Sequence, residues 1–508
     1  MTLTGSVPRR RFGDPGFAFV LIALIVLTVV RIAGLYVSSV DLFFDEAQYW
    51  DWSRELAFGY FSKPPLLAWI IAATDPVCGS SEACARITSP IFYLATSLVI
   101  YAVADALYGR VVAAWSALAF AIATGVVFSS RIVSTDVPLL FFWAVALLAY
   151  VRLLDAPDWR WVVALGVALG LGMLAKYAMI YFVMSAICAA FIDRKARALL
   201  ARPQTWVAIL IAALILSPNV YWNVANGFAT VKHTGDNITG GAMQFRPGWA
   251  AEFFGAQFAV AGPVVFGAFL VILVRMWRVD ISRSDRLMLA FSVPTLALIT
   301  GLSFFRSANA NWAAPALLSM TILTVAWWLR NDHRIALKTT LAIGLIAQVV
   351  VLAGDAYAYR LSLPVLGRGA DIYKRTLGWR ELGSRAAELA RITHAPTVAA
   401  EGRAEVAELI FYLRNEPIRT LSWPVSKVPV DQFDLTRALD NSAAEPVLFI
   451  SICPVASRLK HFYSEVESLG PIDVRTGPTT DRKFHAFKLV ERRQPIEPLG
   501  PCVESPVR

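Results

Sequence analysis

Long apolar runs alternate with short polar segments over most of the chain. Eleven of these runs have the length and composition of a membrane-spanning helix, which needs roughly 20 mostly apolar residues. They cover residues 17–38, 86–107, 111–130, 137–154, 160–175, 177–192, 205–222, 250–274, 287–304, 311–329 and 335–357. A further stretch, PPLLAWIIAA at 64–73, is short and opens with two prolines, so we interpret it as interfacial or re-entrant. If it crosses instead, every later span changes sides.

A different pattern begins after residue 364. Two segments have helical periodicity and three have the composition or alternation of strands. The helical segments are 379–392 and 404–415, and the strand candidates are PTVAAE after the first helix, EPVLFISIC at 445–453 and KFHAFKLVE at 483–491. The pattern predicts a transmembrane domain over 1–364 and a small soluble α/β domain over 365–508.

Composition supports this division. The 508-residue chain is 57% hydrophobic and only 17% charged, whereas soluble proteins are about 25% charged. Charged residues make up about 13% of residues 1–364 and about 26% of residues 365–508. No small-residue cleavage site follows the first run, so we interpret it as an anchor and not as a cleaved signal peptide.

The distribution of basic residues predicts the orientation. With the N-terminal RRR at 9–11 in the cytoplasm, seventeen Lys and Arg fall on the cytoplasmic side and eight on the other side, as the positive-inside rule requires. We therefore expect a cytoplasmic N-terminus and a C-terminal domain on the opposite side of the membrane. The net charge of +10 is scattered over short loops, so we expect membrane lipids and no nucleic acid as partners.

The predicted outer loops collect ionisable and aromatic side chains, which tend to be functional at membrane depth. The acids are Asp45, Glu46 and Asp136, and the bases are Lys63, Arg131, Lys176 and Arg306. The remaining candidates for contact with a substrate are Tyr49, Trp50, Tyr177, His233, Asn311 and Trp312. A carboxylate can act as a general base, cations can hold a leaving phosphate, and aromatic rings can stack on sugars. Sugar transfer from a lipid phosphate would use all three.

Four motifs carry a family resemblance. FFDEAQYWDWSREL, YFSKPPLLAWI, RIVSTDVPLLFFWAVAL and GLGMLAKYAM follow one another over about residues 17–190. Together they resemble the lipid-dependent membrane glycosyltransferases, which include the protein O-mannosyltransferases and the aminoarabinose transferases that modify lipid A. SPNVYWNVANGFATVKHTGDN and ANANWAAPA are similar to the bacterial lipid A and polysaccharide branch.

The resemblance implies a multi-pass α-helical protein of the bacterial inner membrane with the type-C glycosyltransferase (GT-C) fold, its active site on the outer face and its C-terminal domain in the periplasm. It implies inverting transfer from a polyprenyl-phosphate sugar to a lipid A, glycolipid or polysaccharide acceptor. In the matching positions, Asp45 is the base with Glu46 beside it, Lys63 lies near the lipid phosphate, and Asp136 lies near the donor site or the acceptor. The alternative is a transporter or flippase of lipid-linked sugars, which would place charges along a path through the membrane and often contain repeats.

One departure bears on cofactors. Ser62 precedes the KPP lysine, where aminoarabinose transferases often carry an acid that helps to hold a metal. We therefore expect no cofactor, with a divalent metal as the open alternative, and the departure also argues against aminoarabinose as the sugar.

The five cysteines give a further prediction. Cys188 falls inside a span, and the other four fall on the predicted outer side, where the periplasm is oxidising. Cys78 and Cys84 close the short loop CGSSEAC, and Cys453 and Cys502 could tie the tail to a strand. We predict these two disulfides, and four unrelated thiols are the alternative.

Overall fold

The computed structural model describes residues 13–239, 244–276, 281–361 and 373–499 and divides into two compact units. The first unit contains Met1–Ala33, Arg86–Tyr221 and Gly235–Val351, and the second contains Gly34–Ala85, Trp222–Thr234 and Leu352–Arg508. The loop after the first apolar helix thus belongs to the same unit as the C-terminal domain, although they are far apart in the sequence. Each unit is described by itself below.

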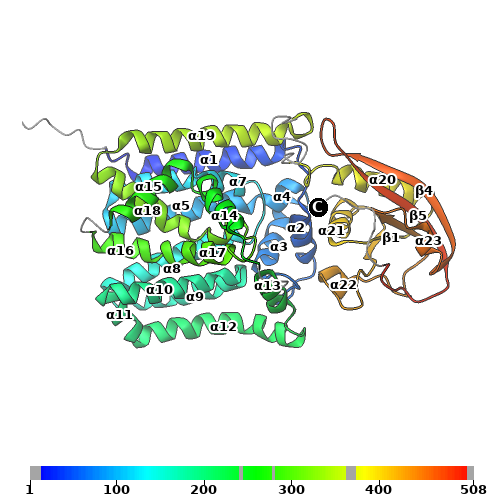
Figure 1. Ribbon diagram of the computed structural model, residues 1–508, viewed down its shortest axis with the longest axis horizontal. Coiled ribbons are helices and arrows are strands. Elements are labelled where there is room, and N and C mark those ends of the chain that lie inside the picture. Colours follow the sequence, from blue (N-terminus) through cyan, green and yellow to red (C-terminus); the bar gives the residue numbers. More distant parts are fainter. Residues whose placement is uncertain (1–12, 240–243, 277–280, 362–372, 500–508) are drawn as a thin grey trace, which may run out of the picture. The chain divides into compact units, whose positions relative to one another are not determined.

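The first unit is helical, and many of its helices run side by side in Figure 1. Its long helices are α1 (Phe17–Val37), α5 (Thr88–Tyr108), α8 (Asp136–Asp155), α9 (Trp159–Ala175), α12 (Pro203–Ala225) and α19 (Arg334–Ala356). Its medium helices are α6 (Arg110–Ala121), α10 (Ile180–Ile192), α14 (Pro247–Val260), α15 (Pro263–Arg275), α17 (Val293–Ser303) and α18 (Ala316–Arg330). The short elements are α7 (Thr124–Ser129), η1 (Tyr177–Met179), α11 (Arg194–Ala201), α16 (Arg283–Ala290) and η2 (Ala310–Ala313).

Six helices in the described part of the chain are long and apolar enough to cross a membrane. The predicted run at 250–274 is not one straight helix, because α14 and α15 meet at an angle of 116°. Gly262 has a φ of +88° there and Pro263 has no backbone N–H, so the helix cannot continue through this point. The bent pair would make a seventh span. Five further apolar helices are shorter, so the count of eleven stays a prediction.

Helices α9 and α12 pack so closely that two positions of α9 have room only for glycine. A Cβ on Gly166 would lie 2.7 Å from the carbonyl oxygen of Ala208, and one on Gly170 would lie 2.8 Å from Cβ of Ile215. The two glycines are one helical turn apart and form one face of α9. Small residues of this kind let membrane helices pack closely, because dispersion forces replace the hydrophobic effect there.

The second unit begins with three helices that follow the first apolar helix. They are α2 (Phe44–Trp52), α3 (Leu66–Cys78) and α4 (Glu82–Arg86). The predicted interfacial stretch at 64–73 is therefore helical from Leu66 onward. A disulfide joins Cys78 to Cys84 across the turn from α3 to α4, with their Cα atoms 5.6 Å apart. Helix α13 (Ala229–Thr239) begins in this unit and continues into the first.

The C-terminal part of the second unit is a five-stranded mixed sheet with the order β2-β1-β3-β5-β4. Its strands are β1 (Thr397–Ala400), β2 (Arg419–Ser422), β3 (Val447–Ser451), β4 (Tyr463–Arg475) and β5 (Asp481–Arg492). β1 pairs in parallel with β2 and β3, whereas β5 is antiparallel to β3 and β4. The helices are η3 (Ala358–Arg360), α20 (Trp379–Ile392), α21 (Arg403–Tyr412), α22 (Gln432–Thr436) and α23 (Ala456–Leu459).

The predicted helices and strands after residue 364 are confirmed by α20, α21, β1, β3 and β5. Strands β2 and β4 and the short helices α22 and α23 were not predicted. Strand β4 forms one edge of the sheet, most of its side chains are at least partly exposed, and Gly470 interrupts its register with β5. An edge strand of this kind lacks the apolar alternation that identifies a half-buried strand.

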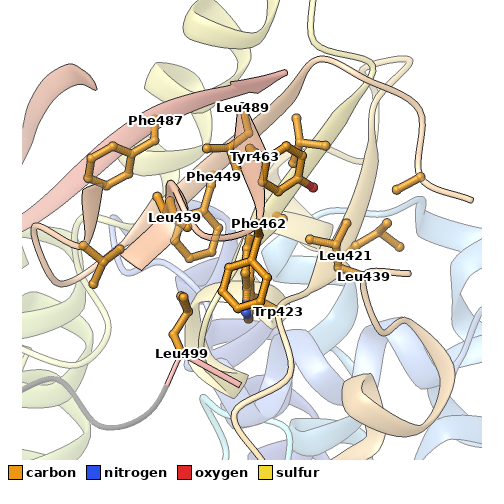
Figure 2. Close-up of a cluster of buried hydrophobic side chains, with 14 of the residues drawn as sticks. Leu421, Trp423, Leu439, Phe449, Leu459, Phe462, Tyr463, Phe487, Leu489 and Leu499 are labelled. Carbon is orange, nitrogen blue, oxygen red and sulfur yellow. The ribbon is translucent and has the colours of Figure 1, made fainter. Parts of the chain in front are cut away.

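One face of the sheet is covered by an aromatic cluster (Figure 2). Trp423 is fully buried, with ring centroids 4.9 Å from Phe449 and 5.5 Å from Phe462. Its indole N–H donates to the carbonyl oxygen of Glu497 at 2.9 Å. This bond satisfies the buried indole and holds the segment after β5 against the sheet.

Candidate functional site

Asp45 lies in the first turn of α2 and is paired with an arginine of the C-terminal domain. Arg403 begins α21, directly after the loop that leaves the carboxyl end of β1. Its Nη1 lies 2.9 Å from Asp45 Oδ1, and both side chains are 35% exposed. Asp45 Oδ2 has no hydrogen bond or ion pair to any residue that the structure describes. The carboxylate is thus paired through one oxygen while the side chain remains partly exposed.

Arg403 makes two further contacts in the same unit. Its Nη1 donates to Gln48 Oε1 at 3.3 Å, and its guanidinium lies 4.8 Å from the centroid of the Phe44 ring. These three contacts fix the guanidinium against the first two turns of α2. No sequence motif marks Arg403. The only signal was an arginine at the start of a helix that follows a buried strand, where loops often carry functional residues.

Glu46, the second acid of the pair, is almost fully buried, with 1% of its surface exposed. Its Oε2 accepts a hydrogen bond from the backbone N–H of Phe43 at 2.9 Å. This is the reach of a capping-box glutamate back to the residue before the helix. The geometry therefore gives Glu46 a role in starting α2.

Tyr49 and Trp50 pack inside the second unit. Each is 5% exposed, and the Trp50 ring meets the Phe411 ring edge to face at 5.0 Å. The Tyr49 ring lies 5.4 Å from that of Trp52. The two predicted sugar-stacking rings thus fill the contact around α2 in this structure.

Lys63 and His233 belong to neighbouring segments of the second unit. Lys63 is partly buried, and its carbonyl oxygen accepts from the N–H of Tyr60 at 3.2 Å. The His233 ring lies 5.8 Å from the Phe61 ring, and Thr230 Oγ1 donates to the carbonyl oxygen of Tyr60. Helix α13 is thereby attached to the segment that carries the KPP lysine.

Asp136 is the centre of a polar cluster in the first unit. It begins α8, and its Oδ1 lies 2.7 Å from Lys176 Nζ. Its Oδ2 accepts from Asn311 Nδ2 at 2.6 Å. The structure thus brings together three predicted site residues that are up to 175 positions apart. Since both carboxylate oxygens are occupied and the side chain is 9% exposed, Asp136 is better placed to fix its neighbours than to take a proton.

Tyr177 extends this cluster to a residue that sequence reasoning missed. The Tyr177 hydroxyl donates to Asn219 Oδ1 at 2.8 Å, and Asn219 is 1% exposed. Asn219 follows Pro218 inside α12, and a polar amide after a proline in an apolar helix could have marked it.

The other candidates of the first unit lie in or next to loops. The Arg131 guanidinium lies 4.6 Å from the centroid of the Phe128 ring. Arg306 follows α17, and its Nη2 is buried without a hydrogen-bond partner among the described residues. Trp312 lies in η2, one residue after Asn311.

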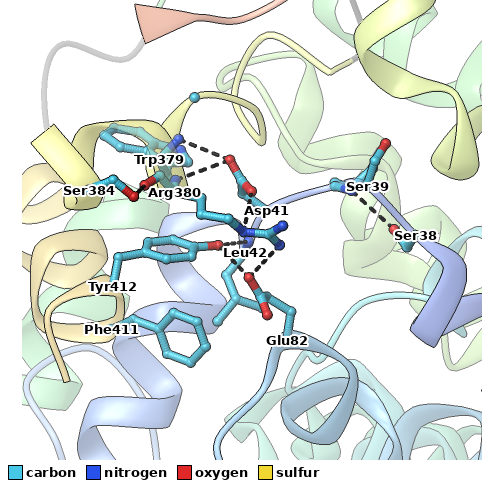
Figure 3. Close-up of polar contacts among 12 residues, drawn as sticks. Ser38, Ser39, Asp41, Leu42, Glu82, Trp379, Arg380, Ser384, Phe411 and Tyr412 are labelled. Atoms are coloured by element: carbon cyan, nitrogen blue, oxygen red, sulfur yellow. Dashed lines mark hydrogen bonds and ion pairs between the residues drawn. The ribbon is translucent and has the colours of Figure 1, made fainter. Parts of the chain in front are cut away.

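A second polar network surrounds Asp41, which precedes the FFDE motif (Figure 3). Asp41 Oδ2 accepts from the backbone N–H of Trp379 at 3.0 Å and of Arg380 at 3.3 Å. Arg380 also pairs with Glu82 at 2.6 Å, and Glu82 accepts from the Tyr412 hydroxyl at 3.2 Å. Burial raises the pKa of Asp41 to about 6, although Arg380 favours its charged form.

The remaining predictions concern metal ions and thiols. Within the described ranges no three His, Cys, Asp or Glu side chains come together as a metal-ligand set. The Cys78–Cys84 disulfide is present, and Cys188 is a free thiol. Cys502 lies outside the described residues, so its pairing with Cys453 stays a prediction.

Comparison with known proteins identifies the class. Residues 62–222, which contain Lys63, Asp136 and Lys176, match the family of dolichyl-phosphate-mannose-protein mannosyltransferases. The fold is similar to that of ArnT from Cupriavidus metallidurans crystallised with undecaprenyl phosphate, with a TM-score of 0.65, 16% identity, and coverage of 94% of this chain and 99% of that one. The protein is a membrane glycosyltransferase of the GT-C fold.

Two curated relatives are similar to the chain over more than half of its length. The chain is 33% identical to the lipid A galacturonosyltransferase RgtD of Rhizobium johnstonii over 432 residues, which are 85% of this chain and 90% of the relative. It is 28% identical to the lipopolysaccharide core galacturonosyltransferase RgtA of the same organism over 301 residues, or 56% of this chain and 59% of that relative. The chain therefore belongs to the bacterial polyprenyl-phosphate-sugar-dependent membrane glycosyltransferases, and the transporter alternative is set aside.

Proposed function

We propose that this protein transfers galacturonate from a polyprenyl-phosphate donor to lipid A or the lipopolysaccharide core, with inversion, at the periplasmic face of the inner membrane. The observation that carries the proposal is the 33% identity to a lipid A galacturonosyltransferase over 85% of the chain. The similarity is not confined to the motif region at 62–222, so the C-terminal unit is part of what the two proteins share.

Asp45 is the general base in this proposal. An acceptor hydroxyl attacks the anomeric carbon, its proton passes to Asp45, and the new C–O bond forms as the bond to the donor phosphate breaks. The polyprenyl phosphate leaves with the electron pair, and a single displacement of this kind inverts the anomeric configuration. Asp45 suits the role better than its two competitors, because Glu46 is buried in a helix start and both oxygens of Asp136 are occupied.

Arg403 has a positioning role in the same scheme. Its ion pair with Asp45 Oδ1 at 2.9 Å holds the carboxylate in one orientation. A general base must be held within reach of the proton that it accepts. The C-terminal domain therefore contributes to catalysis through α21, although it carries no catalytic motif of its own.

The cations have different tasks. We assign Lys63 to the donor phosphate, as the resemblance of its KPP motif implies, and the same role for Arg131 stays a prediction. In the first unit, Lys176 is neutralised by Asp136, so we assign it to positioning. Arg306 has a buried Nη2 without a hydrogen-bond partner among the described residues. A guanidinium in this state can donate a hydrogen bond to a phosphate oxygen at little further desolvation cost.

The test is transfer by the purified protein in detergent, with polyprenyl-phosphate galacturonate as donor and lipid A as acceptor. Mass spectrometry of the product should show the addition of one uronic acid. Asp45→Asn should lower kcat by about 10²–10⁴-fold, because an amide cannot accept the proton, whereas Asp473→Asn on the exposed edge of β4 should have no effect.

Two outcomes would contradict the proposal at different points. Near wild-type turnover of Asp45→Asn would mean that another group is the base. If lipid A and core from a deletion strain keep all the uronic acid of the parent strain, galacturonate transfer is not the function.

A further inference from the structure

The second unit contains a cavity of about 480 Å³ between α2 and the segment that joins α21 to β2. Its size lies within the range of small-molecule sites in proteins. Trp50, Ile410, Leu413 and Ile418 give it apolar walls, and four arginines and two acids give it charge. The charged residues are Arg54, Arg414, Arg419, Arg437, Asp51 and Glu416.

Two of the four arginines are already paired with acids. Arg437 Nη2 lies 2.8 Å from Asp51 Oδ1 and 3.3 Å from Glu55 Oε1. Arg54 Nη1 lies 2.7 Å from Asp75 Oδ2. These pairs fix two sides of the cavity and use the charge of Asp51.

The other two arginines carry the excess charge. Arg414 Nη1 donates to the carbonyl oxygen of Phe411 at 2.6 Å, and the guanidinium lies 4.1 Å from the centroid of the Phe411 ring. This contact orients the guanidinium, which forms no ion pair with any acid that the structure describes. The exposed Arg419 side chain makes no ion pair or hydrogen bond to any residue in the described part of the chain, and neither arginine is within ion-pair distance of Glu416.

A second cavity of about 490 Å³ provides the comparison. It shares Asp51 with the first and has Glu55, Tyr60, Asn226 and Gln432 in its wall, but none of its lining residues is Arg or Lys. Two cavities of similar size in one unit are therefore lined by side chains of opposite net charge. The excess of arginine is a property of one cavity and not of the whole unit's surface.

Guanidinium groups next to apolar walls suit an anionic sugar. A guanidinium binds phosphate or carboxylate through two parallel N–H bonds, which a lysine cannot do. The apolar side chains can contact the C–H face of a sugar ring while the arginines hold its charge. An uncharged glycan could form no ion pair with either arginine.

We propose that this cavity binds an oxyanion, a phosphate or carboxylate, on the saccharide headgroup of the acceptor glycolipid, with Arg414 and Arg419 as the specific contacts. The proposal rests on the proposed function and adds an acceptor site to it. It makes a negative charge on the acceptor a requirement for tight binding.

The experiment measures equilibrium binding and transfer separately with purified full-length protein. The binding probes are lipid A that carries its phosphates, the same lipid A after phosphatase treatment, and inorganic phosphate as a competitor. The double variant Arg414→Ala/Arg419→Ala should weaken binding of phosphorylated lipid A about tenfold or more, since charge-assisted hydrogen bonds are lost. It should bind the dephosphorylated lipid like the wild type, and KM should rise more than kcat falls.

Two matched variants make the result specific. Arg385→Ala removes an arginine from the exposed face of α20, far from the cavity lining, and should bind both lipids like the wild type. Arg414→Lys/Arg419→Lys keeps the charge and should recover part of the affinity. Competition by inorganic phosphate would show whether the site binds any phosphate or also requires contacts with the sugar.

Equal loss for both lipids, or no loss for either, would overturn the proposal. Binding does not depend on turnover, so this failure can be told apart from a failure of the proposed galacturonate transfer. A melting temperature equal to that of the wild type would show that the double variant is folded.

Discussion

At the scale of single residues, the surroundings of each acid in the second unit decide whether it can contact a substrate or only stabilises the fold. Asp45 is 35% exposed and paired through one oxygen, which suits a group that exchanges a proton with a substrate. Asp41 is 1% exposed and accepts two backbone N–H groups at the start of α20. Four positions apart in the sequence, one carboxylate is thus available for chemistry and the other is part of the structure.

Asp41 predicts a specific pH dependence of stability. Its pKa is raised from 3.8 to about 6 by burial, so the folded protein keeps a proton that the unfolded chain has already lost. The stability from this group is complete below pH 4 and is lost as the pH rises through about 6. The loss is about 3 kcal/mol at most.

Asp41→Asn should remove this loss, because the amide oxygen can still accept the N–H groups of Trp379 and Arg380. Thermal unfolding of the purified variant between pH 4 and pH 7.5 should give a flatter profile than the wild type. Asp473→Asn, with an exposed acid on β4, should keep the wild-type profile. Unchanged steepness in Asp41→Asn would show that Asp41 is not the source.

At the scale of elements, the contact between α20 and α21 sets the position of Arg403. Gly383 of α20 faces Tyr412 of α21 so closely that a Cβ added at Gly383 would overlap the Cβ of Tyr412. The Tyr412 hydroxyl in turn bonds to Glu82 and accepts the N–H of Leu42. Helix α21 is therefore held between α20 on one side and the segments next to α2 on the other.

Gly383→Val should force the two helices apart and lower the free energy of unfolding by about 1–3 kcal/mol. It should also lower transfer activity, because Arg403 at the start of α21 would shift away from Asp45. Ser384→Val places the same side chain one position along, on the exposed face of α20, and should change neither property appreciably. Equal melting temperatures for both variants would contradict the close contact.

At the scale of the whole molecule, the disulfide of the second unit bears on which side of the membrane that unit lies. It contains the Cys78–Cys84 disulfide and the C-terminal sheet in one compact unit. Disulfides persist in oxidising compartments, so the disulfide supports our prediction that this unit, and the sheet with it, is periplasmic. This argument is independent of the number of spans, which helix lengths alone leave at six, or seven with the bent pair.

A C-terminal alkaline phosphatase fusion in a bacterial host should therefore be active, and a C-terminal fusion of a reporter that works only in the cytoplasm should be silent. Fusions after Arg194, in a predicted cytoplasmic loop, should give the reverse pattern. If the C-terminal fusions behave like those at Arg194, the second unit is cytoplasmic and both the orientation and the outer-face active site are wrong.

The sequence by itself determined the class of the protein, because membrane spans and motifs are local. Apolar runs must be helical in a bilayer, where every backbone polar group needs an internal partner. The four motifs identified the family and the acids Asp45 and Asp136. The two longer helices, α20 and α21, and the inner strands of the C-terminal domain could also be predicted, since their periodicity lies within each segment. Edge strand β4 could not, because its side chains are mostly exposed.

Only the tertiary structure decided which of these residues meet. The ion pair of Asp45 with Arg403 joins positions 358 residues apart, and that of Asp136 with Lys176 leaves neither group unpaired. The burial of Glu46 depends on packing of α2 against α21, which no local pattern reports. The break between α14 and α15 and the charge of the arginine cavity likewise arise from side chains that folding brings together. Charge pairing, burial and cavities are properties of distances between segments, and a sequence fixes those distances only through the completed fold.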